Sequence, residues 1–226
     1  MRPRLILFDL DGTLVDSVPD LAFAVDAMLA DIGAEPAGID QVRLWVGNGA
    51  DMLVRRALSK SMLPDAIELA DFEFAKERFF HHYQLVNGAY SQLYPQVLAT
   101  LIPLRETIPL MGLVTNKPEQ FTFPLLSMLG LPSFDLVVGG DTLSAKKPDP
   151  AQLLYCMQKL GCKSHEAILV GDSVNDIQAA KAAGVRSVCV TYGYHQGEDL
   201  SAYRPDYLIE QFASLLDIVA SLSHNS

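Results

Sequence analysis

The sequence has little of what disulfide-stabilised, membrane-spanning or secreted proteins require. Its three cysteines, Cys156, Cys162 and Cys189, form no CxxC pair and no even set, which favours buried, reduced thiols over a metal or redox site. No run approaches the roughly 18 apolar residues of a membrane span. The short apolar run at the N-terminus is interrupted by Asp9 and Asp11 and lacks the small-residue cleavage site of a signal peptide. We therefore expect a cytoplasmic protein with no membrane partner.

Positive charge is also scarce. The 17 Lys and Arg residues are outnumbered by 27 Asp and Glu residues, which gives a net charge of -10, and no dense basic block occurs. An acidic protein without a basic patch is a poor candidate for gripping nucleic acid or anionic lipid. We expect no nucleic-acid partner. To bind an anionic substrate, the site would need a metal ion and a few local cations to overcome the negative electrostatic potential of the whole protein.

What the chain does have is enough apolar surface for a large core. Apolar residues make up 50% of the 226 residues and charged residues 19%, a composition that argues against global disorder. The length allows one large domain, or a core with a smaller partner domain.

Short apolar runs alternate with helical periods along most of the chain, which favours a parallel α/β sheet. Strands are expected at 4–9, 110–115, 135–139, 167–171, 185–191 and 206–209, and helices at 118–130, 150–161, 175–184 and 211–222. The interval 16–92 lacks this alternation of strands and helices: it has helical patterns at 18–33, 49–60 and 64–86 and no convincing strand. Because that interval is too long for a crossover, we expect a Rossmann-like α/β core flanked by helices, residues 1–15 and 93–226, with an inserted all-helical domain over residues 16–92.

Four polar clusters fall at or near the carboxyl ends of predicted strands, where ligands bind in an open parallel sheet. Asp9 and Asp11 end the first strand, and residues 115–117 follow the second. The segment AKKPDP follows the third strand, and GDSVND, with Asp172 and Asp176, ends the fourth. Each cluster alone is a weak signal, because Asp or Thr before a helix is usually a cap. Their joint placement on one rim predicts a functional site.

Asp9 and Asp11 place like charges side by side, which costs free energy unless the pair holds a cation or does chemistry. A calcium loop of the EF-hand type does not fit, because its sixth position is Leu14 instead of glycine and its twelfth is Asp20 instead of glutamate. The remaining interpretation is a magnesium ligand that doubles as a nucleophile, since an aspartyl carboxylate is an established phosphoryl acceptor.

The segments DLDGT, VTN, KKPDP and GDSVND resemble, in that order, the four motifs of the haloacid dehalogenase superfamily of phosphotransferases. The resemblance covers almost the whole chain, and the helical insertion is similar to that family's cap domain. It implies magnesium-dependent hydrolysis of a phosphate monoester through an aspartyl phosphate. The segment WVGNGADMLVRRAL is further similar to the phosphoglycolate phosphatases, which implies 2-phosphoglycolate as the substrate.

The resemblance also implies a role for each matched catalytic residue. Asp9 would attack phosphorus, and Asp11 would protonate the leaving alcohol and later take a proton from the hydrolytic water. The Thr115 hydroxyl and the Asn116 backbone N–H would donate to the phosphoryl oxygens. Lys147 would balance the negative charge of Asp9 and phosphate.

A magnesium ion would be the cofactor in this family resemblance, because Mg²⁺ takes one or two carboxylates together with waters and a phosphate oxygen. The protein ligands would be the Asp9 side chain, the Asp11 backbone carbonyl and the Asp172 side chain. Supporting residues would orient these groups or cap the following helix: Thr13, Ser173 and Asp176. Whether Asp176 touches the metal directly is left open.

Selection of the substrate is expected from the loop Gly47-Asn48-Gly49, whose glycines let the backbone approach a ligand and whose Asn48 can hydrogen-bond a carboxylate. The alternative for this loop is an ordinary turn between helices. The expected partner is a small phosphorylated metabolite, and a monomer and a homodimer are both compatible with the sequence.

Other activities share the same motifs. Asp11 argues against a dehalogenase and a phosphonate hydrolase, neither of which needs an acid at that position. A phosphatase of another small metabolite such as a sugar phosphate, and a sugar phosphomutase, stay as alternatives. A non-catalytic magnesium or phosphate sensor would lack at least one catalytic group, and none is missing here.

Overall fold

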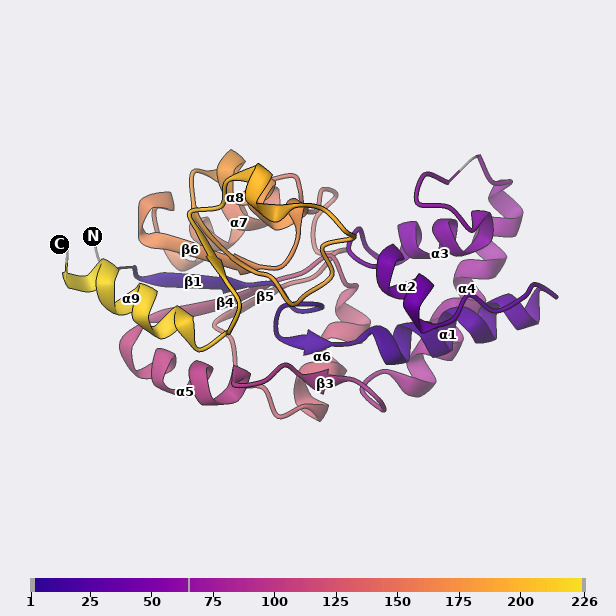
Figure 1. Cartoon of the computed structure of the whole chain (residues 1–226), viewed down its shortest axis with the longest axis horizontal. Coiled ribbons are helices and arrows are strands. Elements are labelled where there is room, and N and C mark those ends of the chain that lie inside the picture. The colour runs from indigo at the N-terminus through magenta and orange to yellow at the C-terminus, as the bar shows by residue number, and fades with distance from the viewer. Residues whose placement is uncertain (1–2, 65, 225–226) are drawn as a thin grey trace.

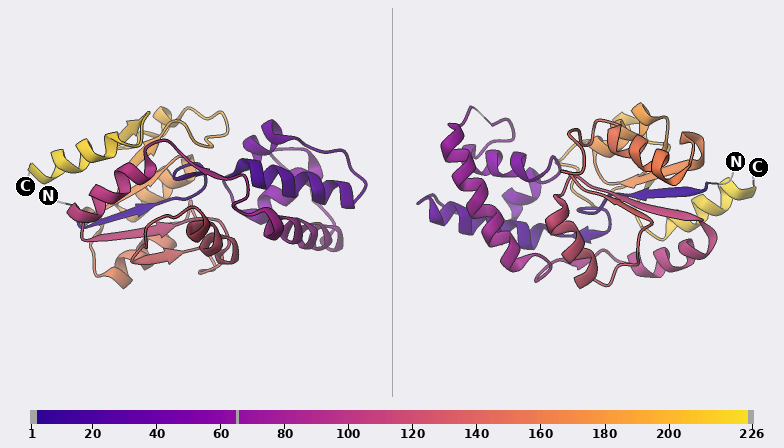
Figure 2. Two further views of the ribbon diagram at one scale, coloured as in Figure 1. Left: turned by 90° about the horizontal axis from the view of Figure 1, so that it is seen from below. Right: turned by 180° about the vertical axis from the view of Figure 1, so that it is seen from behind.

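A computed structural model of the chain, which describes residues 3–64 and 66–224, has a sheet region at one end and a group of helices at the other (Figure 1). The two further views keep these regions separate, joined by a narrow connection (Figure 2). The first and last described residues lie near each other, at the end of the sheet region that is farthest from that group of helices.

The sheet has six strands, all pairing in parallel, in the order β5-β4-β1-β6-β7-β8. Their bounds are β1 Leu5–Phe8, β4 Leu110–Val114, β5 Leu136–Val138, β6 Ala167–Gly171, β7 Arg186–Val190 and β8 Tyr207–Ile209. The chain runs outward from β1 through β4 to β5, then returns to β6 on the other side of β1. Ligands bind at the carboxyl ends of strands where such an order reverses, so the expected site lies beside the end of β1.

Strand β1 is buried on both faces, as a central strand covered by helices should be. Ile6 and Phe8 pack into one core and Leu5 and Leu7 into another, because successive side chains point to opposite faces. The first core is completed by α5 Val97–Thr107, α6 Glu119–Met128 and α9 Ser214–His224; the second by α7 Ala151–Leu160 and α8 Val174–Ala183. The expected Rossmann-like α/β core is confirmed.

Four helices form the insertion after β1: α1 Val18–Asp31, α2 Ile39–Trp45, α3 Ala50–Ser59 and α4 Leu69–Val86. They share a third apolar core, in which Trp45, Phe79 and Tyr83 are almost fully buried and to which Phe121 and Tyr194 of the sheet region contribute. The insertion is joined to the sheet region by a short antiparallel ladder, β2 Val15–Asp16 with β3 Gln92–Leu93. An inserted all-helical region is confirmed, while the domain limits at 15/16 and 92/93 stay a prediction.

Some elements were not expected from the sequence. These are α2, α5, the β2–β3 ladder and two 3₁₀ turns, Ser164–Glu166 and Leu200–Tyr203. The three cysteines are free thiols, with Cys156 and Cys189 buried as expected. Across residues 3–64 and 66–224, no helix is both long enough and apolar enough to cross a bilayer.

Candidate active site

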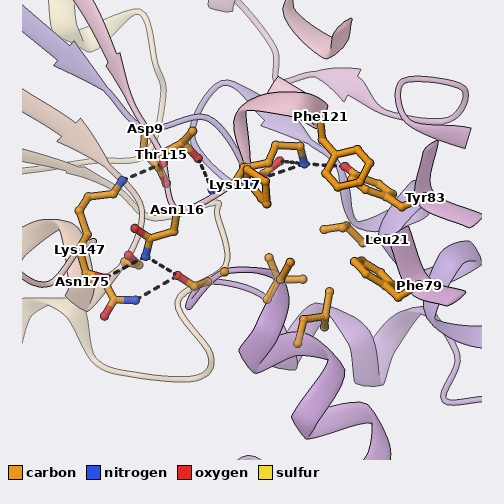
Figure 3. A pocket seen from close by; sticks show the side chains of 18 residues that line it. Asp9, Leu21, Phe79, Tyr83, Thr115, Asn116, Lys117, Phe121, Lys147 and Asn175 are labelled. Carbon is orange, nitrogen blue, oxygen red and sulfur yellow. Dashed lines mark hydrogen bonds and ion pairs between the residues drawn. The ribbon is translucent and has the colours of Figure 1, made fainter. Parts of the chain in front are cut away.

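A pocket lies at the carboxyl ends of β1 and β4, between the sheet region and the helical insertion (Figure 3). The sheet side contributes polar groups and the insertion contributes mainly apolar ones. The lining includes Asp9, Asp11, Thr115, Asn116, Lys117 and Lys147 from the sheet region, and Leu21, Val46, Gly47, Gly49, Leu53, Phe79 and Tyr83 from the insertion. The pocket therefore combines reactive groups on one wall with an apolar wall opposite.

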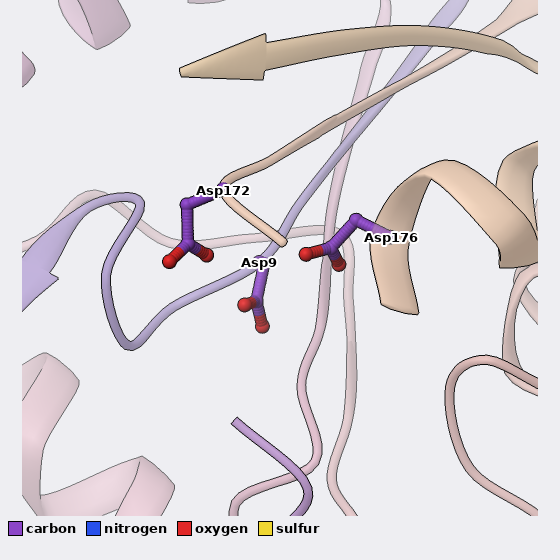
Figure 4. Close-up of side chains that lie close together, drawn as sticks. All are labelled: Asp9, Asp172 and Asp176. Carbon is purple, nitrogen blue, oxygen red and sulfur yellow. The ribbon is translucent and has the colours of Figure 1, made fainter. Parts of the chain in front are cut away.

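Three carboxylates gather beside this pocket: Asp9 after β1, Asp172 after β6, and Asp176 in the first turn of α8 (Figure 4). One oxygen from each lies within 4.8 Å of the others. The Lys147 ammonium joins two of them, with Nζ 2.8 Å from Asp9 Oδ1 and 2.7 Å from Asp176 Oδ1. The structure thus brings together residues from three distant parts of the sequence, around Asp9, Lys147 and residues 172–176.

The electrostatics of this cluster favour a bound cation. Burial raises the pKa of Asp9 to about 7, although Lys147 opposes the rise. Burial also raises the pKa of Asp172, and the neighbouring charges of Asp9 and Asp176 add to that effect. Burial lowers the pKa of Lys147, but both carboxylates outweigh it and the net shift is upward. In their ionised form the three buried carboxylates face one ammonium, and a divalent cation with oxygen ligands fits the excess negative charge.

Asp172 is held by its surroundings in a fixed orientation. Thr13 Oγ1 donates to Asp172 Oδ1 over 3.0 Å, and the Tyr194 backbone N–H donates to Oδ2 over 2.5 Å. Among the described residues no cation lies within 4 Å of this carboxylate. Gly12, with φ +87°, passes so close that a Cβ on it would lie 2.1 Å from Asp172 Oδ2. A side chain at Gly12 would therefore displace the carboxylate.

Asp176 and Ser173 form a reciprocal cap at the start of α8. Asp176 Oδ2 accepts from the Ser173 backbone N–H over 3.1 Å and from the Ser173 hydroxyl over 2.5 Å, while Oδ1 accepts from Lys147. Both oxygens of Asp176 thus already accept hydrogen bonds. This arrangement suits the orienting role expected from the sequence, which stays a prediction.

Asp11 points to a different set of partners from Asp9. Its Oδ1 accepts from the Ser17 hydroxyl over 2.5 Å, and Lys117 Nζ lies 3.0 Å and 3.2 Å from its two carboxylate oxygens. The ammonium of Lys117 also donates to the hydroxyl of Tyr83, which comes from α4 of the insertion. From the sequence, Lys117 could be placed at the rim without a role, and no pattern singled out Tyr83.

Thr115 and Asn116 follow β4 directly and face the same pocket. Thr115 Oγ1 accepts from the Lys117 backbone N–H over 3.1 Å, which leaves its own hydroxyl hydrogen free to donate. The Asn116 side chain donates to the carbonyl oxygen of Lys147 over 2.9 Å. Gln152, which the sequence analysis missed, donates to the Thr115 carbonyl over 3.1 Å and accepts from the Lys147 N–H over 3.1 Å. These bonds fix the Thr115 and Lys147 loops relative to each other.

The loop Gly47-Asn48-Gly49 closes one side of the pocket with its backbone. The carbonyl oxygen of Gly47 accepts from the side chains of Asn116 and Asn175, over 3.4 Å and 3.2 Å. Gly47 and Gly49 line the pocket, whereas Asn48 lines a neighbouring cavity.

The side chain of Asn48 is held outside the pocket by two neighbours. Its oxygen accepts from Arg56 over 2.9 Å, and its amide donates to Asn175 over 3.4 Å. The expectation that this loop selects the substrate stays a prediction.

Comparison with known proteins gives concordant matches over most of the chain. A family model described as haloacid dehalogenase-like hydrolase matches residues 6–190. Phosphoglycolate phosphatase 1 of Pseudomonas aeruginosa is 49% identical over 95% of this chain and 79% of its own length. The phosphoglycolate phosphatase of Aliivibrio fischeri is 44% identical over 96% of each chain. A crystal structure of a predicted phosphoglycolate phosphatase from Haemophilus somnus 129PT has a TM-score of 0.89 at 36% identity, covering 96% of this chain and 98% of that one.

Proposed function

This chain belongs to the haloacid dehalogenase-like hydrolase family, and from that membership we propose that it hydrolyses small phosphate monoesters, with 2-phosphoglycolate as its substrate. The relatives named phosphoglycolate phosphatase support this substrate, since they are 44% and 49% identical over nearly the whole chain.

Asp9 is the nucleophile in this proposal. Its carboxylate lies at the end of a rigid, fully buried strand, and the Lys147 ammonium 2.8 Å away stabilises the charged form that attacks phosphorus. The bond from phosphorus to the ester oxygen breaks as the bond to Asp9 forms. The same ammonium offsets the repulsion between the carboxylate and the phosphoryl oxygens. Thr115 donates its free hydroxyl hydrogen to one of those oxygens.

Asp11 is the general acid and base. It lines the same pocket as Asp9 but is held by Ser17 and Lys117, apart from the cluster that contains Lys147. In the first step it gives a proton to the leaving alcohol, and in the second it takes one from the water that hydrolyses the aspartyl phosphate. Two carboxylates with separate partners can serve these separate tasks.

A magnesium ion would be held by Asp9 and Asp172, with Asp176 beside them. The resemblance to the family adds the Asp11 backbone carbonyl as a further ligand. When bound, the ion supplies positive charge against the phosphoryl oxygens. Thr13 and Tyr194 hold Asp172 ready for that role. Gly12 has no side chain that would collide with the Asp172 carboxylate.

One observation carries the proposal: Asp9, paired with Lys147, lines the same pocket as Asp11 and Thr115, so nucleophile, acid and phosphoryl donor converge on one space. The test is phosphate release from a panel of small phosphate esters with and without magnesium. We expect the largest kcat/KM for 2-phosphoglycolate and no turnover in the presence of a magnesium chelator. A clear preference for a sugar phosphate would contradict the substrate but not the reaction.

The covalent step has its own test. Asp9→Asn should reduce turnover below about one per cent, because an amide neither attacks phosphorus nor supplies an anionic ligand. Rapid acid quench of the wild-type enzyme should trap phosphate on Asp9, detectable by peptide mass spectrometry. A phosphorylated residue other than Asp9, or full activity in the variant, would rule out the proposed nucleophile.

A further inference from the structure

Lys117 is a buried cation whose only role in the chemistry described above is as a partner of Asp11. It follows Thr115 and Asn116 on the loop after β4, and the residue is 5% exposed. Its Nζ lies 3.0 Å from Asp11 Oδ1, and the side chain lines the pocket.

The two lysine ammoniums of the pocket differ in how much negative charge they already meet. Lys147 bridges two carboxylates of the acidic cluster. Lys117 meets one, that of Asp11, and its other contact is the neutral hydroxyl of Tyr83. Figure 3 shows the two ammoniums on opposite sides of Asp9 and Thr115. A phosphate ester held at Asp9 would thus have its remaining atoms free to extend toward Lys117.

The surroundings of Lys117 are built to hold it firmly in a poorly solvated space. Its Nζ lies 4.8 Å from the centre of the Tyr83 ring, a cation–π distance. That ring stacks on Phe79, at 5.6 Å between centres, and meets Phe121 of α6 at 4.8 Å. These rings and Leu21 form an apolar wall of the pocket, and the Lys117 ammonium lies at one end of that wall. An anion that reaches the ammonium there meets little competition from water.

We propose that Lys117, assisted by the Tyr83 hydroxyl, binds a second negative group of the substrate, a carboxylate separated from the phosphoryl group by a short carbon chain. The inference rests on the proposed function and deepens it by assigning the residue that recognises the carboxylate. The substrate carboxylate takes the place of Asp11 on the ammonium, and the Asp11 side chain is released toward the leaving oxygen. Tyr83 lies on the insertion and Lys117 on the sheet region, so recognition uses both parts of the molecule.

The test compares Lys117→Met with the wild type on two substrates that differ at one group: 2-phosphoglycolate and 2-hydroxyethyl phosphate, in which a neutral hydroxymethyl replaces the carboxylate. We expect the variant to lose about 100-fold or more in kcat/KM for 2-phosphoglycolate, and a loss at least about tenfold smaller for 2-hydroxyethyl phosphate. Equal losses for both substrates would overturn the proposal and leave Lys117 as a positioning residue for Asp11.

Two further variants complete the comparison. Lys76→Met is the control: Lys76 also pairs with one aspartate, Asp51, at 3.0 Å, but on the surface of the insertion. This variant should leave the ratio of the kcat/KM values for the two substrates unchanged. Tyr83→Phe keeps the ring and removes the hydroxyl, so it should shift the ratio in the same direction as Lys117→Met but by less. A ratio that Tyr83→Phe leaves at the wild-type value would contradict the assisting role of the hydroxyl.

Inhibition by glycolate separates this inference from the proposed function. In wild-type enzyme, glycolate should inhibit hydrolysis of p-nitrophenyl phosphate competitively and ethylene glycol should not; Lys117→Met should relieve the inhibition. If the wild type ignores 2-phosphoglycolate but glycolate inhibits through Lys117, the proposed substrate fails and the carboxylate site stands. If glycolate does not inhibit the wild type, the carboxylate site is wrong, whether or not the variant folds.

Discussion

Thr13 shows how a residue that would touch neither substrate nor metal can govern a metal site. Its hydroxyl donates to Asp172 Oδ1 and so fixes the carboxylate in one orientation. Thr13→Val keeps the shape and removes the hydroxyl. We expect magnesium affinity to fall about 10- to 100-fold, the usual effect of losing a partner of a metal ligand. Activity should return at high magnesium, measured as phosphate release against magnesium concentration.

A matched control for that variant is Thr122→Val. Thr122 of α6 is also buried, but its hydroxyl donates to the carbonyl oxygen of Pro118, the residue just before that helix. Its magnesium dependence should equal that of the wild type. A Thr13→Val enzyme that binds magnesium normally but turns over slowly would show that Thr13 acts on catalysis and not on the metal.

Asp11 and Asp9 should respond differently to loss of charge, although one residue separates them. Asp11→Asn keeps the backbone carbonyl, so magnesium binding should be nearly intact. Turnover should still fall by roughly 100- to 10,000-fold, the usual size of a lost general acid and base. Isothermal titration gives the binding and phosphate release the rate. A variant that loses magnesium and recovers activity at high metal would make Asp11 a ligand only.

The site residues that could be predicted from the sequence are those that follow the ends of strands. Asp9, Asp172 and Lys147 could be placed on one rim, because parallel strands end at one edge of a sheet. The contact of Lys117 with Tyr83 could not be placed in this way. It depends on how α4 docks against the loop after β4, and an aromatic run in a helix indicates only a buried face. The hydrogen bonds by which Gln152 joins the Thr115 carbonyl to the Lys147 N–H likewise depend on the packed fold.

At the scale of elements, one buried carboxylate holds the returning end of the insertion. Asp20, in the first turn of α1, accepts from the backbone N–H groups of Gly88 and Tyr90, each over 2.7 Å, and from the N–H and hydroxyl of Ser91. Asp20→Asn would turn an amide NH₂ toward these donors. We expect a loss of about 2–4 kcal/mol in the free energy of unfolding, measured by urea denaturation.

Asp51→Asn provides the comparison for Asp20→Asn. Asp51 pairs with Lys76 on the surface, so removing its charge should change the free energy of unfolding by less than about 0.5 kcal/mol. Equal losses in the two variants would mean that the return segment is held by packing alone.

A second element contact should make stability depend on pH. Arg105 of α5 donates to both oxygens of Asp135, just before β5, and the Met111 N–H of β4 donates to one of them. These bonds, that of Arg105 foremost, lower the pKa of Asp135 in the folded protein. A lowered pKa stabilises the fold above the unfolded value of 3.8, and this contribution is lost as the pH falls further.

Asp135→Asn tests that dependence. The variant should be less stable than the wild type at pH 7 by up to about 1 kcal/mol, because the pair is partly exposed. The difference should shrink as the pH falls below 3.8. Urea unfolding of both proteins across this range gives the difference directly. If the difference in the free energy of unfolding between the two proteins is unchanged at low pH, the ion pair contributes nothing to stability.

Most elements could be predicted because their apolar pattern is regular. The exceptions have physical reasons. Helix α5 has no side-chain cap at Gln96 and carries Pro103 in its interior. The sequence therefore gives no signal for where this helix begins, and the proline argues against its continuing. Helix α2 spans only seven residues, Ile39–Trp45, too few to establish a helical period. Strands β2 and β3 have two residues each and exist because they pair with each other.

For the whole molecule, the acidic cluster should make stability depend on the metal. Magnesium at about 100 times its dissociation constant should stabilise the fold by about 2.7 kcal/mol, a rise in Tm of roughly 5–10 °C for a chain of this length. Asp172→Asn removes a buried carboxylate that has no cation partner among the described residues. Without metal this variant should melt above the wild type, and magnesium should no longer shift its Tm. A variant that melts lower without metal would contradict the electrostatic cost of the cluster.

The pairing of β2 with β3 has a consequence for how such enzymes can diversify. The two strands are antiparallel neighbours, so the points where the chain leaves the sheet region and re-enters it are about 5 Å apart. A segment with adjoining ends can be excised and exchanged while the sheet keeps its connectivity. A chimera that carries another protein's helices between Asp16 and Gln92 would keep the carboxylates and Lys117 of this chain and acquire a new apolar wall. The part of substrate selection that depends on the apolar wall can then be inherited separately from the chemistry, while Lys117 stays with the sheet region.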